Sequence, residues 1–163
     1  MTGVHALPIY RVPKDIDASK VVQDDFAGAL QATEYLIRQG YTRIAHIAGP
    51  ENLQFTQQRL NGYLQALEQH NMIIDQRLIV YSGFSQTHGA TDALKLLALP
   101  DRPDAIFAAN DRKAVGAIQT IKQQGLRVGQ DIGVIGFTND PIATVVEPNL
   151  STIEEPAMEI GKR

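Results

Sequence analysis

The sequence predicts an α/β fold in which helices cover both faces of a doubly wound parallel sheet. Short apolar segments suited to strands alternate with longer segments whose apolar residues recur every three or four positions, as in amphipathic helices. Successive strand segments start roughly 30 residues apart, which is the length of one βαβ unit. These segments are apolar at consecutive positions, which indicates a sheet buried on both faces. Right-handed crossovers between such strands produce the doubly wound arrangement.

The first regular element is predicted to begin near residue 25, because residues 1–20 contain Pro8, Pro13 and several charges and are expected to be irregular. The apolar positions that follow predict a helix ending before Gly40, since glycine commonly follows a helix end. Three more amphipathic helices are predicted around residues 60–67, 90–97 and 115–121. Gly125 marks the end of the last one.

Four buried strands are predicted between these helices, at residues 43–48, 78–81, 104–108 and 132–137. In open α/β sheets, ligands bind outside the carboxyl ends of the strands. The loops at those ends are residues 49–58, 82–88, 109–111 and 138–142. Notable side chains in or beside them are Arg59, Phe84, Asn110, Asp111, Thr138, Asn139 and Asp140.

The composition is that of an ordinary globular chain, with 163 residues, 44% hydrophobic and 20% charged, a length that suits one domain. The absence of cysteine excludes disulfides, thiol catalysis and thiolate metal sites, and fits a reducing cytoplasm. A net charge of −3 argues against a free-standing nucleic-acid binder, which usually presents a basic face. No apolar run approaches the ~20 residues of a membrane span, and the N-terminus does not resemble a secretory signal. We therefore expect a cytoplasmic protein that does not contact a membrane.

Sequence motifs for cofactors and metals are missing. Neither the glycine-rich dinucleotide fingerprint nor the P-loop pattern occurs, so no backbone cradle for phosphates is predicted. The four histidines, His5, His46, His70 and His88, are scattered and form no metal-binding pair. His46 lies between apolar residues of a predicted strand, which favours a histidine of the core or of an interface. The sequence predicts neither a cofactor nor a metal.

The segment Gly83-Phe84-Ser85-Gln86-Thr87 lies between a strand and a helix, where a hydrolase carries its nucleophile. Thr87 replaces the second glycine of that motif, and its Cβ crowds the tight turn. We therefore favour Ser85 or Thr87 as a cap of the next helix over a catalytic role. A hydrolase-like enzyme would need Ser85, His88 and Asp111 to converge within hydrogen-bond reach.

Two other polar residues have ordinary structural interpretations. Asn110 at a strand end, followed by Asp111 in the first helical turn, suits helix capping and the helix dipole. Arg59, three residues into a helical pattern, would on physical grounds alone be a solvated surface residue.

Several stretches resemble transcriptional regulators of the lactose-repressor (LacI/GalR) family, in the order that the family has them. The resemblance covers nearly everything from residue 8 to the end. Its stretches are VVQDDFAGA (21–29) with the residues leading to Gly40 and Tyr41, IAHIAGP (44–50), RLNGY (59–63), FAANDRKAVGA (107–117), DIGVIGF (131–137) and PNLSTI (148–153).

This resemblance implies the two-lobed, type I periplasmic-binding-protein-like architecture, which closes around a small ligand, and a sensor that is not an enzyme. Arg59 matches the family's arginine that grips effector oxygens, and its planar fork suits bidentate contacts. Phe84 falls where the family places an aromatic residue that stacks on the effector. Asn110 matches an asparagine that hydrogen-bonds the ligand, and Asp25 corresponds to a polar position of the first lobe near the cleft. The implied effector is a sugar or a related small molecule.

The sequence departs from the family pattern after the fourth strand. Many members carry an aspartate directly after the glycine-aromatic pair, but here Thr138 follows Phe137, with Asn139 and Asp140 beyond it. Either Asn139 or Asp140 takes over the grip on sugar hydroxyls, or the ligand differs from a simple pyranose. Thr138 and Asn139 are therefore counted among the expected effector-binding residues.

By the same resemblance, residues 1–39 correspond to a remnant of the first lobe with its crossover helix, residues 40–147 to the second lobe, and residues 148–163 to a truncated return segment. One lobe would be nearly complete and the other truncated. Residues 1–39 and 150–163 would then lack the sheet they normally pack on, and we expect them to be disordered or docked on another copy. Such a chain should bind effector weakly.

The partners implied are a small-molecule effector, a second copy in a homodimer, and DNA only through a helix-turn-helix domain outside this chain. A sugar-binding protein for transport is the main alternative, and it predicts a secretory signal in the complete gene. The hydrolase-like enzyme is the third hypothesis.

Overall fold

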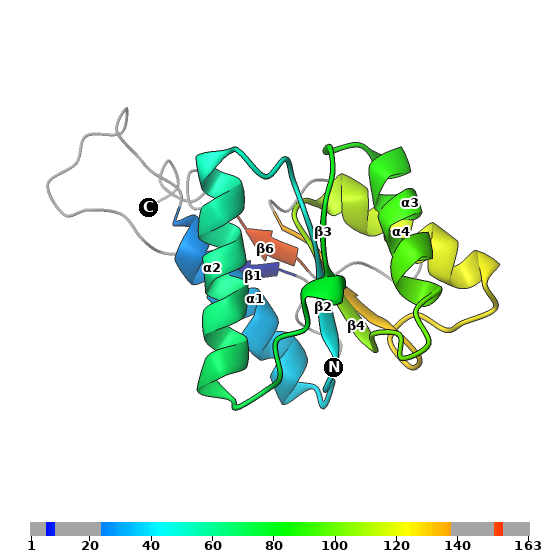
Figure 1. Cartoon of the computed structure of the whole chain (residues 1–163), viewed down its shortest axis with the longest axis horizontal. Helices are drawn as coiled ribbons and strands as arrows, with labels where there is room; N and C mark the ends of the chain where they lie inside the picture. The colour runs from blue at the N-terminus through cyan, green and yellow to red at the C-terminus, as the bar shows by residue number, and fades with distance from the viewer. Residues whose placement is uncertain (1–5, 9–23, 138–151, 155–163) are drawn as a thin grey trace, which may run out of the picture.

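The computed structural model describes residues 6–8, 24–137 and 152–154, and its centre is a four-stranded parallel sheet flanked by two helices on each face (Figure 1). The strand order β3-β2-β4-β5 places the first of these strands inside the sheet, as a doubly wound topology requires. The predicted fold class is therefore confirmed. The strands are β2 (Ile44–Ala48), β3 (Ile79–Tyr81), β4 (Ala105–Ala108) and β5 (Gly133–Ile135), and the helices are α1 (Asp25–Arg38), α2 (Gln54–Gln69), α3 (Gln86–Leu97) and α4 (Asp111–Gln123), with a 3₁₀ turn η2 (Gln76–Leu78) before β3.

Alternate residues of the central strands face two separate cores. Ile44 of β2 and Phe107 of β4 pack against α1 and α2, whereas Ile47 and Ile106 pack against α3 and α4. Both strands are buried along their whole length, so both faces can be apolar. This explains why the strand segments in the sequence are apolar at every position.

Glycines allow the helices of each pair to approach closely. A Cβ at Gly62 of α2 would overlap the carbonyl oxygen of Phe26 in α1 and lie 2.8 Å from the Ala29 Cβ. A Cβ at Gly89 of α3 would likewise overlap the Lys113 carbonyl oxygen in α4 and lie 2.6 Å from the Lys113 Cα. Each helix pair is thus packed backbone to backbone at these glycines.

Local signals set the helix ends. Asp24, Ser85 and Asn110 cap α1, α3 and α4, each accepting a hydrogen bond from a backbone N–H three residues on. Gly40 and Gly125 follow α1 and α4 with φ of 101° and 81°, a region that favours glycine. The capping role predicted for Ser85 and Asn110 is confirmed.

The expectation for the first 39 residues needs correction. Residues 25–38 form α1, whose Ala29, Ala32 and Leu36 are buried in the core beside α2, so this helix has a full packing partner within the chain. Residues 1–20 are also not irregular throughout, because β1 (Ala6–Pro8) pairs in parallel with β6 (Thr152–Glu154). The amphipathic face of α1 and the small Gly62 opposite it account for the docking. The rest of that expectation, for residues 1–39 and 150–163, lies outside the described residues.

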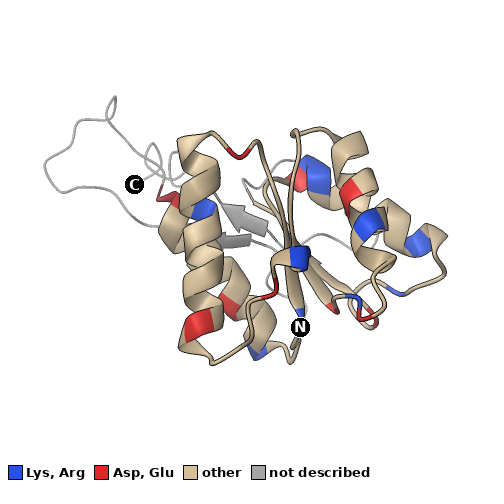
Figure 2. Cartoon of the chain, in the orientation of Figure 1, with Lys and Arg blue, Asp and Glu red and all other residues tan. Residues whose placement is uncertain are grey.

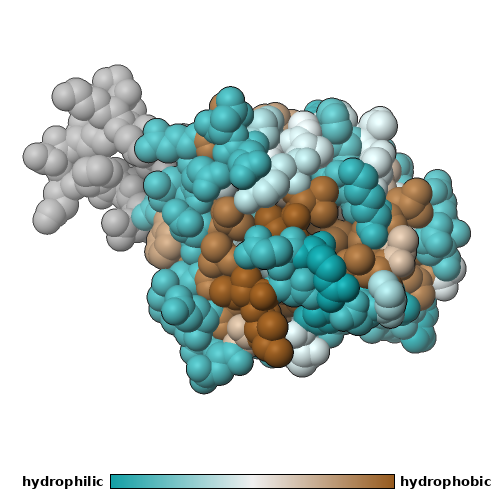
Figure 3. All heavy atoms as spheres, in the orientation of Figure 1, coloured by the Kyte–Doolittle hydropathy of each residue, from teal (hydrophilic) through white to brown (hydrophobic). Residues whose placement is uncertain are grey.

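The described surface carries mixed charge and one apolar area. Acidic and basic residues are interspersed over the helices and loops (Figure 2). An apolar area lies over the connection between α2 and η2 (Figure 3), where Ile73 is 88% exposed. No helix in the part of the chain that the structure describes has the length and apolar character needed to cross a bilayer.

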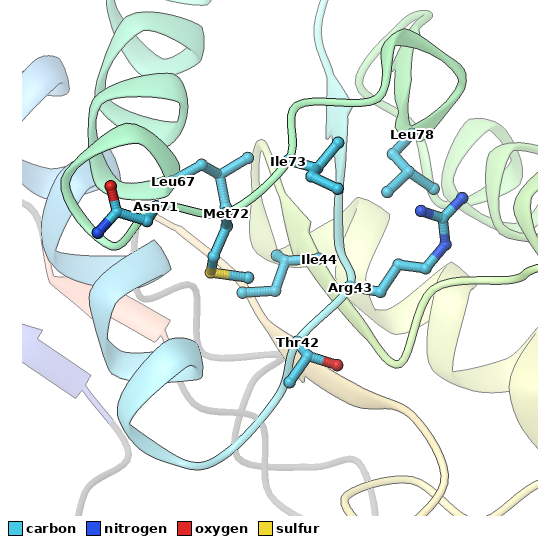
Figure 4. A pocket seen from close by; sticks show the side chains of 8 residues that line it. All are labelled: Thr42, Arg43, Ile44, Leu67, Asn71, Met72, Ile73 and Leu78. Atoms are coloured by element: carbon cyan, nitrogen blue, oxygen red, sulfur yellow. The ribbon is translucent and has the colours of Figure 1, made fainter.

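A pocket of about 350 Å³ lies beside this apolar area, at the amino end of β2 (Figure 4). Its charged lining residue, Arg43, is bound by Asp75 at 2.9 Å and Asp101 at 3.2 Å. The pocket is therefore at the opposite end of the sheet from the loops predicted to bind a ligand, and its cation is already neutralised. We do not regard it as the functional site.

Candidate functional site

The candidate site lies at the carboxyl ends of β2 and β4, the two neighbouring strands at which the direction of winding reverses. In open α/β sheets a crevice forms at this switch point, because the connections leave toward opposite faces. Gly49 and Pro50 follow β2, and Ala109 and Asn110 follow β4. These backbone segments contact two of the candidate side chains, because Arg59 donates to Ala109 and Phe84 lies on Gly49.

Arg59 is held at this edge by three elements. Its Nε donates to Asp25 Oδ1 of α1 at 2.9 Å, and its Nη1 donates to the Ala109 carbonyl oxygen at 2.6 Å. Its guanidinium carbon lies 4.1 Å from the ring centroid of Phe137 and 5.1 Å from that of Phe55, within cation–π range. The side chain is only 7% exposed. The expectation of a solvated arginine is therefore wrong, since tertiary contacts bury it and fix its orientation.

Asp25 lies in the first turn of α1, where α1 meets α2. Burial raises the pKa of its carboxyl group, and this effect exceeds the lowering by the Arg59 charge and hydrogen bond; the neighbouring Asp24 raises the pKa further. The aspartate therefore lies beside the arginine in a partly desolvated environment. The structure brings Asp25 and Arg59 together although they are 34 positions apart.

Phe84 is stacked on Phe55, with ring centroids 5.7 Å apart and planes inclined by 30°. The ring also lies on the backbone of Gly49, where a Cβ would be 2.6 Å from Phe84 Cε1. Phe55 is 37% exposed, so the aromatic pair has one open side. It borders the Arg59 guanidinium and offers an apolar surface beside a hydrogen-bond donor.

Asn110 links the loop that carries Phe84 to α4. Its Oδ1 accepts from the Lys113 backbone N–H at 2.8 Å, and its Nδ2 donates to the Phe84 carbonyl oxygen at 3.2 Å. An amide has two N–H donors and two oxygen lone pairs, so capacity is left for a ligand after these two bonds. Thr138 and Asn139, together with Asp140, lie outside the described residues.

Two buried ionic residues were missed by the sequence reasoning. Lys113 of α4 is fully buried, and its Nζ is 3.1 Å from Asp92 Oδ2 of α3. The same Nζ donates to Ser82 Oγ at 2.8 Å and to the Ala48 carbonyl oxygen at 2.7 Å. A signal existed, because a lysine and an aspartate occupy positions on two otherwise apolar helix stripes. Phe55, four positions before Arg59 on α2, was likewise predictable as its helical neighbour.

Ser85 and His88 are neighbours because they share the first turn of α3. Ser85 Oγ accepts from the His88 backbone N–H at 3.0 Å and lies 2.7 Å from His88 Nδ1. The imidazole covers Gly83, where a Cβ would be 2.5 Å from His88 Cε1. Asp111, the third residue of the hydrolase hypothesis, is buried in the first turn of α4. Helix capping accounts for the bond from the His88 backbone, and the side-chain contact joins neighbouring residues at the helix N-terminus.

His46 is a core residue, as its sequence neighbours suggest. Its ring is stacked between those of Phe107 and Tyr63, at centroid distances of 4.5 Å and 5.3 Å. Burial lowers the pKa of His46 to about 3, so the ring is neutral at physiological pH. Its Nδ1 lies 3.0 Å from the Phe107 carbonyl oxygen, which fits a donating N–H on that atom. Across the described ranges, no cluster of three or more histidine, aspartate or glutamate side chains could hold a metal ion.

Comparisons with known proteins agree with this arrangement. The periplasmic binding protein-like domain family matches residues 33–163. The chain is 37% identical over 148 residues to the HTH-type transcriptional repressor CytR of Escherichia coli, covering 91% of the chain and 43% of that protein. It is 38% identical over 158 residues to the probable HTH-type transcriptional repressor ExuR of Bacillus subtilis, covering 95% of the chain and 47% of that protein. The chain therefore spans less than half the length of these relatives.

Solved structures give the same result. A LacI-family regulatory protein from Chloroflexus aggregans superposes with a TM-score of 0.81 at 34% identity, over 95% of this chain and 56% of that one. A complex of the transcriptional regulator CelR with cellobiose superposes with a TM-score of 0.80 at 35% identity, over 85% of this chain and 42% of that one. The chain belongs to the periplasmic binding protein-like domain family, in the form found in LacI-family transcriptional regulators.

Proposed function

We propose that this chain senses a sugar or a related small polyhydroxy molecule for a LacI-type transcriptional repressor. The observation that carries the proposal is the oriented, buried guanidinium of Arg59 beside the Phe55–Phe84 aromatic pair, at the switch point of the sheet. A planar fork of donors suits vicinal oxygens, and an aromatic surface suits the apolar face of a sugar ring or a base. CytR and ExuR are named as repressors, and the similar structure of the regulator CelR is a complex with cellobiose.

In this proposal, Arg59, Phe84, Asn110 and Asp25 contact or frame the effector, and Thr138 and Asn139 complete the contact from the loop after β5. Residues 40–147, together with helix α1 packed against α2, form one lobe of the sensor, and the rest of residues 1–39 and residues 148–163 belong to or lead into the other. Effector binding shifts the balance between two arrangements of the lobes and thereby changes DNA affinity.

The remaining partners follow from the same proposal. DNA is contacted through a helix-turn-helix domain that is separate from these residues, and a second copy forms a homodimer. The relatives are repressors of bacteria, and a repressor of this kind acts on DNA in the cytoplasm, which is the location that we propose for this protein. The chain senses a ligand and does not catalyse a reaction, which agrees with Ser85 serving as a helix cap.

The test is a calorimetric titration of the complete gene product with a panel of mono- and disaccharides and nucleosides. Arg59→Ala should weaken binding of the sugar or nucleoside found by about thirtyfold, or ~2 kcal/mol, because a charge-assisted contact is lost. Phe84→Leu should also weaken binding while leaving the Arg59–Asp25 ion pair in place. Arg127→Ala is the matched control, since Arg127 is an exposed arginine paired with Asp131. Wild-type affinity in both Arg59→Ala and Phe84→Leu would overturn the site assignment.

A further inference from the structure

The loop from Ser82 to Ser85 carries Phe84, and it is tied down from both ends. At its start, the Ser82 backbone N–H donates to the Ala48 carbonyl oxygen at 3.2 Å. At its end, Ser85 caps α3. In the middle, the Phe84 carbonyl oxygen accepts from Asn110. A loop fixed at so many points is expected to hold its aromatic ring in one place.

The Lys113 ammonium lies at the start of the loop, where it contacts both Ser82 and Ala48. Its three donors reach Ala48, Ser82 and Asp92, which lie at the end of β2, at the end of β3 and on α3. Ser82 Oγ in turn donates to Asp92 Oδ2 at 2.6 Å. Every donor of the ammonium is therefore used within the chain.

This network lies in a dry environment. The Lys113 and Asp92 side chains are 0% and 2% exposed. Burial lowers the pKa of Lys113, and this effect exceeds the raising by the charge of Asp92. A buried ion pair of this kind is weak evidence for stability, since apolar residues of similar volume often stabilise a core as well or better. Stability alone therefore does not explain this ion pair, whereas its contacts with Ser82 and Ala48 hold the start of the loop.

We propose that Lys113, Asp92 and Ser82 are positioning residues, which fix the loop 82–85 so that Phe84 is oriented before a ligand arrives. The relevance to ligand binding rests on the function proposed above, whereas the positioning itself does not. Lys113 also donates its backbone N–H to Asn110, which holds the Phe84 carbonyl oxygen. One residue of α4 thus contributes to two of the three attachments of the loop. Supporting contacts of this type lower the ordering cost of binding.

The sharpest variant is Ser82→Ala, because it detaches the loop side chain and leaves the direct Lys113–Asp92 contact at 3.1 Å. Its matched control is Thr120→Val, which also removes a hydrogen bond of a hydroxyl group between α4 and α3. That bond runs from Thr120 Oγ1 to the Ala90 carbonyl oxygen and is not connected to the loop 82–85. Amide hydrogen exchange on the whole chain, followed by mass spectrometry, measures the exchange rate of the loop. The exchange rate of β4 reports unfolding of the whole domain and serves as the reference.

Ser82→Ala and Lys113→Met should speed exchange in residues 82–85, which include the bonded amide of residue 82, at least tenfold relative to β4, and Thr120→Val should not. Lys113→Met combined with Asp92→Leu removes both charges and should recover global stability while the loop stays fast. If the loop exchanges at the wild-type rate in Ser82→Ala and in the double variant, the positioning role is overturned.

A tryptophan at position 84 gives a second, ligand-free readout, because the chain has no native tryptophan. In Phe84→Trp, fluorescence anisotropy should fall when Ser82→Ala is added, and an unchanged anisotropy would count against the proposal. Neither measurement requires a sugar. Failure of the sugar titration would therefore leave the positioning role standing, and failure of these measurements would leave the proposed function standing.

Discussion

Helix pairs α1–α2 and α3–α4 each meet along a glycine, and each buries one ion pair near the carboxyl ends of the strands. The pair on the α1–α2 side, Arg59–Asp25, keeps 7% and 14% of its side chains exposed and borders the half-open aromatic pair. The pair on the α3–α4 side, Lys113–Asp92, is closed off and its ammonium is saturated by protein oxygens.

The difference separates two uses of buried charge. A guanidinium that keeps an edge near solvent and aromatic rings nearby can exchange contacts with a ligand at little cost. The Lys113 ammonium has every donor occupied by protein oxygens, so it has none left for a ligand and stabilises only its present contacts. We infer that the Arg59–Asp25 pair is placed to contact a ligand and that the Lys113–Asp92 pair holds the loop that carries Phe84.

The largest expected loss of stability comes from breaking the closed ion pair, Lys113–Asp92. Lys113→Met leaves an uncompensated buried carboxylate at Asp92, which should lower the free energy of unfolding by about 3–5 kcal/mol. Arg59→Met should cost less, because Asp25 is partly hydrated and its raised pKa eases protonation. Urea unfolding followed by circular dichroism gives both values. Equal losses in the two variants would remove the distinction between an open and a closed pair.

The glycine contacts come next and test whether the two helix pairs are equally tight. Gly62→Ala and Gly89→Ala each force a methyl group against backbone atoms, and each should destabilise the fold by about 1–3 kcal/mol. Ala66→Gly on α2 is a control that removes a methyl group without adding volume. If either glycine variant were as stable as the original chain, the corresponding helices would have to be able to separate freely.

The smallest effect concerns the core on the α1–α2 face, which contains His46. Its folded-state pKa of about 3 lies below the ordinary value of 6.5, so unfolding binds a proton at acidic pH. The stability contributed by the neutral ring is present above pH 6.5 and falls as pH decreases toward 3, by at most about 1.4 kcal/mol per pH unit. The difference in unfolding free energy between the chain and His46→Phe, measured from pH 7 to pH 5, should follow this slope. A pH-independent difference would mean that His46 is not buried as described.

Much of the fold could be predicted because its signals are local. Apolar runs placed the four strands of the main sheet within a few residues, and Ser85, Asn110 and Gly40 marked helix ends by their own backbone chemistry. The β1–β6 pair was missed, because three-residue strands at the two ends of a chain leave no periodic pattern. The docking of α1 was missed for a related reason, since the glycine that admits it, Gly62 on α2, is 33 positions from Ala29, which it contacts.

For the candidate site, the sequence by itself determined the residue types at the strand ends: Arg59, Phe84 and Asn110 follow from the strand–helix alternation and from a resemblance that the comparisons support. Only the tertiary structure decided what surrounds them. It buried Arg59 between Phe55 and Phe137, supplied Asp25 from another helix, and joined Lys113 to Asp92 and Ser82. The physical reason is that periodicity and capping act over a few residues. Desolvation and ion pairing depend on which distant residues the folded chain brings within about 4 Å.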